Sequence, residues 1–86
     1  MGPLHLAIIV DELPDDLLAE IDRRWPVGAN TRRKVSAFIR HCYSNYDAVC
    51  YSLAGHRYDE LQNAARDKIG AALDEWLERH PRITIT

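Results

Sequence analysis

The sequence has no long run of apolar residues. The longest near its start, LAIIV at residues 6–10, is followed at once by Asp11 and Glu12. It is shorter than the hydrophobic region of a secretory signal, and far shorter than the ~20 apolar residues of a membrane-spanning helix. We therefore expect a cytoplasmic protein that has no membrane partner.

Cysteine and glycine are also scarce, which argues against several kinds of site. The two cysteines, Cys42 and Cys50, would lie about 12 Å apart along one helix, beyond the reach of a disulfide. No Cys-x-x-Cys or His-x-x-x-His pair predicts a metal site, and the glycines form no phosphate-binding loop. We expect no metal, no cofactor, and free, buried thiols at both cysteines.

The chain has too few residues for a second domain and no strong excess of one charge. Its 86 residues are 47% hydrophobic and 28% charged, and the net charge is −2. These values are typical of one small globular domain, which has a modest core and little room for a deep catalytic cleft. We therefore expect a single domain over residues 1–86 that is not an enzyme.

Two short segments near the ends have the pattern of β-strands. Residues 4–10 (LHLAIIV) are rich in branched apolar side chains, and residues 82–86 (RITIT) alternate apolar with polar. Two isolated strands are only marginally stable in water. They must pack on helices, pair with each other, or pair across a second copy of the chain. A homodimer through the terminal strands is therefore one prediction.

Between these segments, the apolar spacing predicts three helices. The first covers residues 13–25, and the third runs from a capping box formed by Asp59 and Gln62 to the proline at position 81. Trp25 and Trp76 lie in the apolar stripes and are expected in the core. The fold class we expect is mainly α, a three-helix unit with a short strand at each terminus, or α+β if the strands pair.

The middle helix has one apolar face from end to end, so we expect it to be unbroken over residues 31–54. That face consists of Val35, Phe38, Ile39, Cys42, Tyr46, Val49, Cys50 and Leu53. The alternative is two helices with a break before Ser44, because the segment SNYD can form a capping box with Asp47 at its third position.

The opposite face of this helix is basic and aromatic. Residues 31–58 contain five basic residues and one acid, whereas the segments before and after them are acidic. Arginine and tyrosine are enriched at protein interfaces, and together they also suit single-stranded nucleic acid. The candidate partner-binding residues are Arg33, Lys34, Arg40, His41, Ser44, Asp47 and Tyr51, and Tyr43 also lies off the apolar face. An ordinary solvated face is the other interpretation.

Three of these residues have the side chains of a nucleophilic triad. His41, Ser44 and Asp47 lie three residues apart, so that successive members are neighbours on a helix. No pattern in the sequence supplies an oxyanion hole or a nucleophile elbow. We interpret the spacing as a coincidence.

The segments IRHCYSNYD and ARDKIGAALDEWL resemble those of an uncharacterised bacterial and fungal family of short helical domains. That family has an Arg-His-x-x-Thr/Ser-x-Tyr-Asp segment and then an Ala-Arg helix that ends near a Trp. The matching residues are Arg40, His41, Ser44, Tyr46 and Asp47, then Ala65, Arg66 and Trp76. The resemblance covers roughly residues 33–78, with Cys42 and Ser44 where other residues are expected. It implies helices and no particular activity.

The sequence thus predicts a non-enzymatic protein–protein interaction module, an adaptor or inhibitor of the kind that phages and mobile elements encode. Its partner would contact the polar face of the middle helix, or the terminal strands would add to another sheet. The alternative is a nucleic-acid-binding module that uses residues 31–58 and whose affinity falls with salt.

Overall fold

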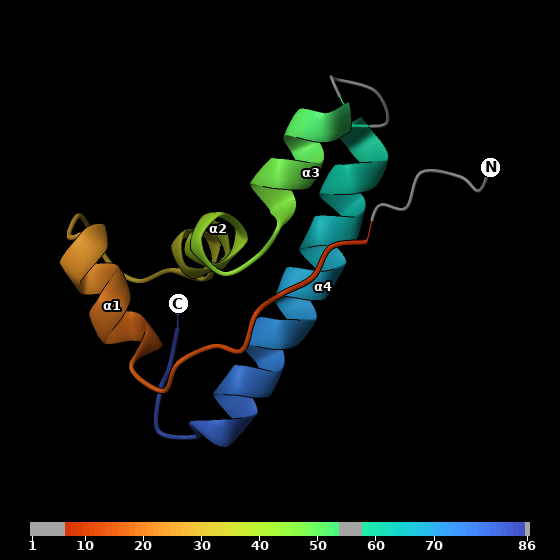
Figure 1. Cartoon of the computed structure of the whole chain (residues 1–86). Helices are drawn as coiled ribbons and strands as arrows, with labels where there is room; N and C mark the ends of the chain where they lie inside the picture. Colours follow the sequence, from red (N-terminus) through yellow and green to blue (C-terminus); the bar gives the residue numbers. More distant parts are fainter. Residues whose placement is uncertain (1–6, 54–57, 86) are drawn as a thin grey trace.

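Four helices make up most of the described part of the chain, which is residues 7–53 and 58–85 of a computed structural model. They are α1 (Leu17–Arg24), α2 (Arg32–Cys42), α3 (Tyr46–Leu53) and α4 (Tyr58–Arg79). Helix α2 packs against the other three, and α3 also packs against α4 (Figure 1). The mainly α fold class is confirmed, but the described residues contain four helices where three were predicted.

The prediction of an unbroken helix over residues 31–54 is wrong. Helix α2 ends at Cys42 and α3 begins at Tyr46, so the alternative with a break around Ser44 is confirmed. The two short helices point in different directions, and α3 runs beside α4 (Figure 1). Tyr46 is still buried after the break, because the turn leaves the apolar side of each helix against the core.

The break is held by the segment before α1. The Asp11 N–H donates to the Tyr43 carbonyl over 2.8 Å, and the Asn45 N–H donates to the Ile9 carbonyl over 3.2 Å. The Asn45 side chain accepts from the Ile9 N–H at 2.9 Å and donates to the Ala7 carbonyl at 3.0 Å. Residues 7–11 thus satisfy backbone groups that the helix would otherwise pair within itself, which is why the chain can turn here.

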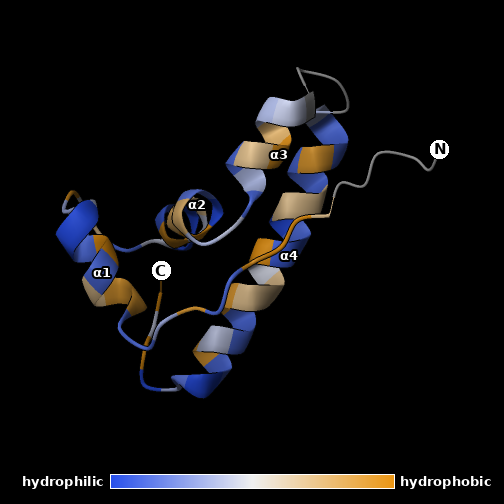
Figure 2. Cartoon of the chain, viewed as in Figure 1, coloured by the Kyte–Doolittle hydropathy of each residue, from blue (hydrophilic) through white to orange (hydrophobic). Residues whose placement is uncertain are grey.

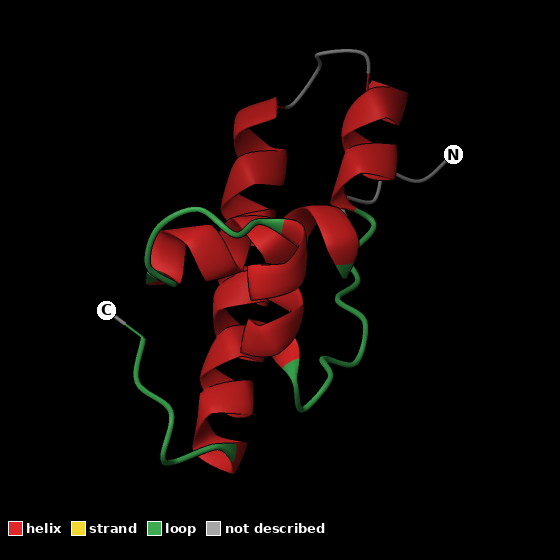
Figure 3. Cartoon of the chain, turned by 90° about the vertical axis from the view of Figure 1, so that its left-hand side faces the viewer, coloured by secondary structure: helices red, strands yellow, loops and turns green. Residues whose placement is uncertain are grey.

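Neither predicted strand forms within the described residues (Figure 3). Residues 4–6 and 86 lie outside them. In residues 7–10 there is one isolated antiparallel bridge, between Val10 and Ser44, and residues 83–85 have no regular structure. Ile83 and Ile85 are nevertheless half-buried against the core while their neighbours are exposed. The alternating burial predicted there is confirmed, although the hydrogen-bonded ladder is not present.

The core forms where the hydrophobic sides of the helices meet (Figure 2). Its buried members are Ile8, Leu13, Leu17, Ile21, Val35, Phe38, Ile39, Tyr46, Leu61, Ala65, Ile69, Leu73 and Trp76. Trp76 is fully buried, as predicted, whereas Trp25 is half-buried at the edge and packs edge-to-face on Phe38, with ring centroids 5.2 Å apart.

The start of α4 differs slightly from the prediction. The helix begins at Tyr58, one residue before the expected cap, so Asp59 lies in its first turn. The Gln62 amide donates to the hydroxyl of Tyr58 at 2.6 Å and to that of Tyr46 at 3.4 Å. Gln62 therefore connects α4 to α3 by a side-chain contact that a local capping pattern does not describe.

The two cysteines are free, as predicted, but they are half-buried rather than buried. In the part of the chain that the structure describes, no three metal-ligating side chains lie close enough together to hold an ion. No helix within these residues has the length and apolar character needed to cross a bilayer.

Candidate anion-binding groove

The break between α2 and α3 divides the seven predicted binding residues among three places. Four of them lie on α2, namely Arg33, Lys34, Arg40 and His41. Ser44 lies in the turn, and Asp47 and Tyr51 lie on α3. Because the two helices point in different directions, these residues do not line one straight face (Figure 1).

Lys34 and Ser44 make local structural contacts. The Lys34 ammonium donates to the carbonyls of Val27 at 2.9 Å and Gly28 at 3.3 Å. It thereby holds the loop before α2, in which Gly28 has a positive φ of 78°. The Ser44 hydroxyl donates to the Arg40 carbonyl and accepts from the Tyr46 N–H. Ser44 therefore ends α2 and starts α3.

His41 and Asp47 pair across the break. The Nδ1 atom of the His41 ring lies 2.8 Å from a carboxylate oxygen of Asp47, so the Asp47 side chain does not form the predicted capping box with Ser44. Of the suspected triad, only this His–Asp contact is present. The Ser44 hydroxyl is bonded to a backbone carbonyl rather than to the imidazole.

Arg33 and Tyr51 project into solvent. Tyr51 is 90% exposed, and Arg33 is exposed on the first turn of α2. Tyr43, in contrast, is half-buried, and its hydroxyl donates to a Glu20 carboxylate oxygen at 2.7 Å. This hydrogen bond, together with burial, raises the pKa of Tyr43 to about 12. Tyr43 therefore joins the turn to α1 and is not part of an exposed aromatic surface.

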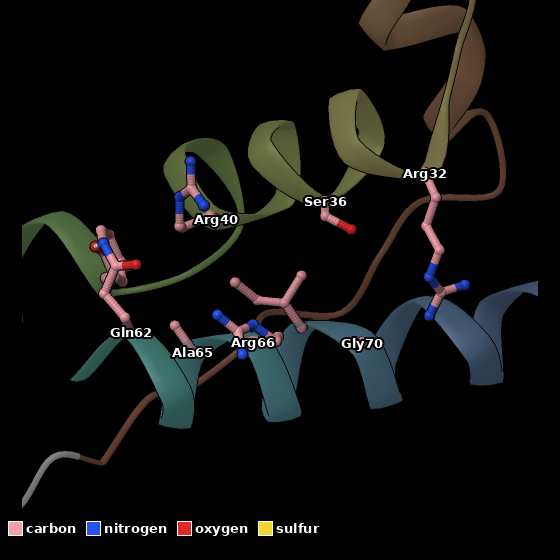
Figure 4. Close-up of a pocket in the computed structure, with 9 residues that line it drawn as sticks. Arg32, Ser36, Arg40, Gln62, Ala65, Arg66 and Gly70 are labelled. Carbon is pink, nitrogen blue, oxygen red and sulfur yellow. Dashed lines mark hydrogen bonds between the residues drawn. The ribbon is translucent and has the colours of Figure 1, made fainter. Parts of the chain in front are cut away.

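A groove between α2 and α4 brings together basic residues that are far apart in the sequence. Its volume is about 270 Å³. Arg32 and Arg40 lie at opposite ends of α2, and Arg66 lies on the facing part of α4 (Figure 4). The lining residues are Arg32, Ser36, Arg40, Tyr46, Gln62, Ala65, Arg66, Ile69 and Gly70. Three of these residues are arginines and none is acidic.

Two of the three arginines have no acidic partner among the residues that the structure describes. Arg32 forms an ion pair with Asp74, with a nitrogen–oxygen distance of 2.8 Å. Within residues 7–53 and 58–85, no carboxylate pairs with Arg40 or with Arg66. The groove therefore has an uncompensated positive charge between α2 and α4.

The guanidinium of Arg40 is held mainly by aromatic rings. Its central carbon lies 5.4 Å from the centre of the Tyr46 ring, and one terminal nitrogen is 3.5 Å from Nε2 of His41. Its Nε–H is shielded from solvent and has no hydrogen-bond acceptor within residues 7–53 and 58–85. A buried donor without an acceptor costs about 1–3 kcal/mol. A ligand oxygen that accepted this hydrogen would remove the cost.

Neutral hydrogen-bonding groups complete the groove. Ser36 supplies a hydroxyl on α2, and Gln62 supplies an amide on α4. Burial raises the pKa of Tyr46 above its ordinary value, so its hydroxyl stays protonated and uncharged. Every ionised side chain that lines the groove is therefore cationic, and its polar atoms favour an anion.

Arg40 was among the predicted binding residues, whereas its counterpart Arg66 was noted only as a position of the family resemblance. A usable signal was present, because residues four apart lie on the same face of a helix. Arg32, Ser36 and Arg40 form one such row on α2, and Gln62, Arg66 and Gly70 form another on α4. That these two rows face each other depends on the packing of α2 against α4, which no local pattern contains.

Gly70 leaves room in the groove at some cost to helix stability. A methyl group added there would meet only the Arg32 guanidinium, at 3.8 Å, which is an ordinary contact. Since glycine inside a helix is less favourable than alanine by about 0.5–1 kcal/mol, we expect Gly70→Ala to raise the free energy of unfolding by that amount. Urea denaturation followed by circular dichroism measures it. A lower stability would show that the space at Gly70 is needed.

Comparisons with known proteins find no match for this chain among family models, curated proteins or solved structures. The resemblance of residues 33–78 to a family of short helical domains stays a prediction. The argument about function therefore depends on the groove.

Proposed function

We propose that the protein is a non-enzymatic interaction module that binds an acidic segment of a partner protein in the groove between α2 and α4. The observation that supports this most is the pair of arginines, Arg40 and Arg66, that line the groove and have no carboxylate partner in the described part of the chain. Unpaired guanidinium groups favour carboxylate or phosphate oxygens, which they bind through paired hydrogen bonds.

The length of the groove suits an extended segment rather than one isolated side chain. Arg32 and Arg40 are eight residues apart on α2, so they are separated by about 12 Å of helix rise. One acidic side chain of a bound peptide can therefore contact Arg40, while a second competes with Asp74 for Arg32. The overall net charge of −2 favours a partner that is recognised locally, in the groove, over one attracted by the whole surface.

Binding to short peptides rich in Asp and Glu tests the proposal. We expect fluorescence anisotropy at low salt to detect binding by the unmodified protein. The double substitution Arg40→Glu with Arg66→Glu should weaken it by about 100-fold or more, because each lost charge-assisted hydrogen bond is worth about 1.5–3 kcal/mol. Thermal denaturation of the variant verifies that it remains folded.

A matched control reverses two basic residues outside the groove. Lys68→Glu with Arg82→Glu makes the same change in net charge at two exposed positions. Measured at about 0.15 M salt, where charges more than about 8 Å away are largely screened, the control should alter the dissociation constant by less than about threefold. Equal weakening by both double variants would assign the binding to net charge and contradict a groove site. Failure of all acidic peptides to bind would also contradict it.

A second candidate function is the binding of single-stranded nucleic acid. The exposed ring of Tyr51 on α3 favours this function, because exposed aromatic rings and arginines together bind unpaired bases and phosphates. The acidic net charge weighs against it, since dedicated nucleic-acid binders are usually basic. An oligonucleotide in the same assay distinguishes the two functions. If the oligonucleotide binds in a salt-sensitive way and the acidic peptides do not bind, the partner is a nucleic acid and the proposal of a protein partner is wrong.

A further inference from the structure

We infer that the part of the groove between Arg40 and Arg66 is an oxyanion subsite for a phosphoryl group on a side chain of the partner protein. The inference depends on the proposed function, since it specifies which acidic group the partner presents there. Arg32, at the other end of α2, is already paired with Asp74 and is not part of this subsite.

The Arg40 side of the subsite has a hydrogen-bond donor that the protein leaves unused. The Nε–H is shielded and has no acceptor, while the aromatic ring of Tyr46 supports the guanidinium from one face. Unsatisfied buried donors are uncommon in folded proteins, so a ligand that brought an acceptor to this atom would add a hydrogen bond that the described residues do not make. A small rotation of the guanidinium that turned its Nε–H edge toward a ligand oxygen would satisfy this donor.

The opposite side of the subsite supplies a second guanidinium. Arg66 is exposed on α4 and faces α2 across the groove (Figure 4). The Gln62 amide, one turn before it, already donates to two tyrosine hydroxyls. The Ser36 hydroxyl lies one turn before Arg40 on α2. An anion between the two helices thus meets a charged donor from each wall and the hydroxyl of Ser36.

This combination of donors favours a phosphoryl group over a carboxylate. A phosphorylated side chain has a charge of about −1.5 to −2 and three strong acceptor oxygens, whereas a carboxylate has a single charge and two oxygens. The two positive charges of the guanidinium groups balance the charge of a phosphoryl group but exceed the single charge of a carboxylate. A nucleic-acid phosphate has one negative charge and would place further charged phosphates along an acidic protein, so the observations favour the phosphorylated protein.

Peptides that differ at one position test this inference. An Asp- and Glu-rich peptide library is prepared with serine, glutamate or phosphoserine at one fixed position, and binding is measured by fluorescence anisotropy. We expect the phosphoserine peptides to bind about tenfold or more tightly than the serine peptides, with the glutamate peptides between them. Inorganic phosphate alone should shift the Arg40 Nε–H resonance in the nuclear magnetic resonance spectrum.

The substitution Arg40→Lys separates the fork geometry of arginine from its charge. Lysine keeps the positive charge but cannot offer two parallel donors. We expect it to reduce the preference for phosphoserine over serine to less than about threefold, while Asp- and Glu-rich peptides still bind. Arg82→Lys, at an exposed position outside the groove, is the matched control and should keep the full preference.

The outcomes distinguish failure of the subsite from failure of the proposed function. Equal binding of the three peptide series, with no effect of phosphate on Arg40, would overturn the subsite. The proposed function would then stand if acidic peptides still require Arg40 and Arg66. Binding of phosphoserine peptides without binding of other acidic peptides would support the subsite and contradict the broader acidic preference. Tighter binding of an oligonucleotide than of any phosphoserine peptide would overturn the assignment to a protein.

Discussion

Replacing Trp76 by alanine is expected to lower the free energy of unfolding by about 3–5 kcal/mol, the usual cost of removing a large aromatic side chain from a core. Trp76 on α4 is fully buried. Its indole N–H donates to the Pro14 carbonyl at 2.9 Å, and its ring stacks on His80 with the centroids 4.0 Å apart. One side chain thus joins α4 to the segment before α1. Urea denaturation followed by circular dichroism measures the loss.

Two further variants separate the contribution of the Trp76 hydrogen bond from that of its burial. Trp76→Phe keeps a buried ring but removes the hydrogen bond to Pro14, so we expect a smaller loss of about 1–3 kcal/mol. Trp25→Ala is the matched control, because Trp25 is only half-buried at the edge of the core. Its effect should be clearly smaller than that of Trp76→Ala. Equal losses for the two alanine variants would contradict the central position of Trp76.

The second large effect is expected from Asn45→Ala, which should cost about 1–3 kcal/mol for the loss of two hydrogen bonds. The Asn45 side chain makes two hydrogen bonds to the segment before α1, accepting from Ile9 and donating to Ala7. Alanine leaves both backbone groups without these partners and loosens the contact that holds the α2–α3 break. Hydrogen exchange of the Ile9 and Asp11 amides should become faster, and urea denaturation measures the loss of stability.

Asn63→Ala is the control for this prediction. Asn63 is exposed on α4, where alanine is a better helix former, so the change should be neutral or slightly stabilising. If Asn45→Ala were equally neutral and left the exchange of Ile9 unchanged, the segment 7–11 would not depend on the Asn45 side chain. The break would then have to arise from the turn around Ser44 alone.

Much of the helical content could be predicted from local patterns. The 3–4 spacing of apolar residues located the helix that became α4, and the same spacing identified Trp76 as a core residue. The prediction of one continuous central helix was wrong for a specific physical reason. Its apolar residues have one phase on both sides of Tyr43, so periodicity alone favours continuity, although a break around Ser44 was recognised as the alternative.

The candidate site was predictable only in part. The basic segment and Arg40 were visible in the sequence, but Lys34 and Ser44 proved to hold local structure. Arg66 was noted in the sequence only as part of the family resemblance, without a binding role. Its significance comes from standing opposite Arg40 across a groove that has no acidic lining.

The sequence by itself determined where helices can form, which of their sides are apolar, and that basic residues concentrate in one segment. These are properties of neighbours along the chain, because helical spacing and charge are local. Only the tertiary structure decided that the middle helix breaks, since the break is stabilised by hydrogen bonds from residues 7–11, more than thirty positions away. It likewise decided that arginines from α2 and α4 share one groove, because the packing of two distant helices brings them together.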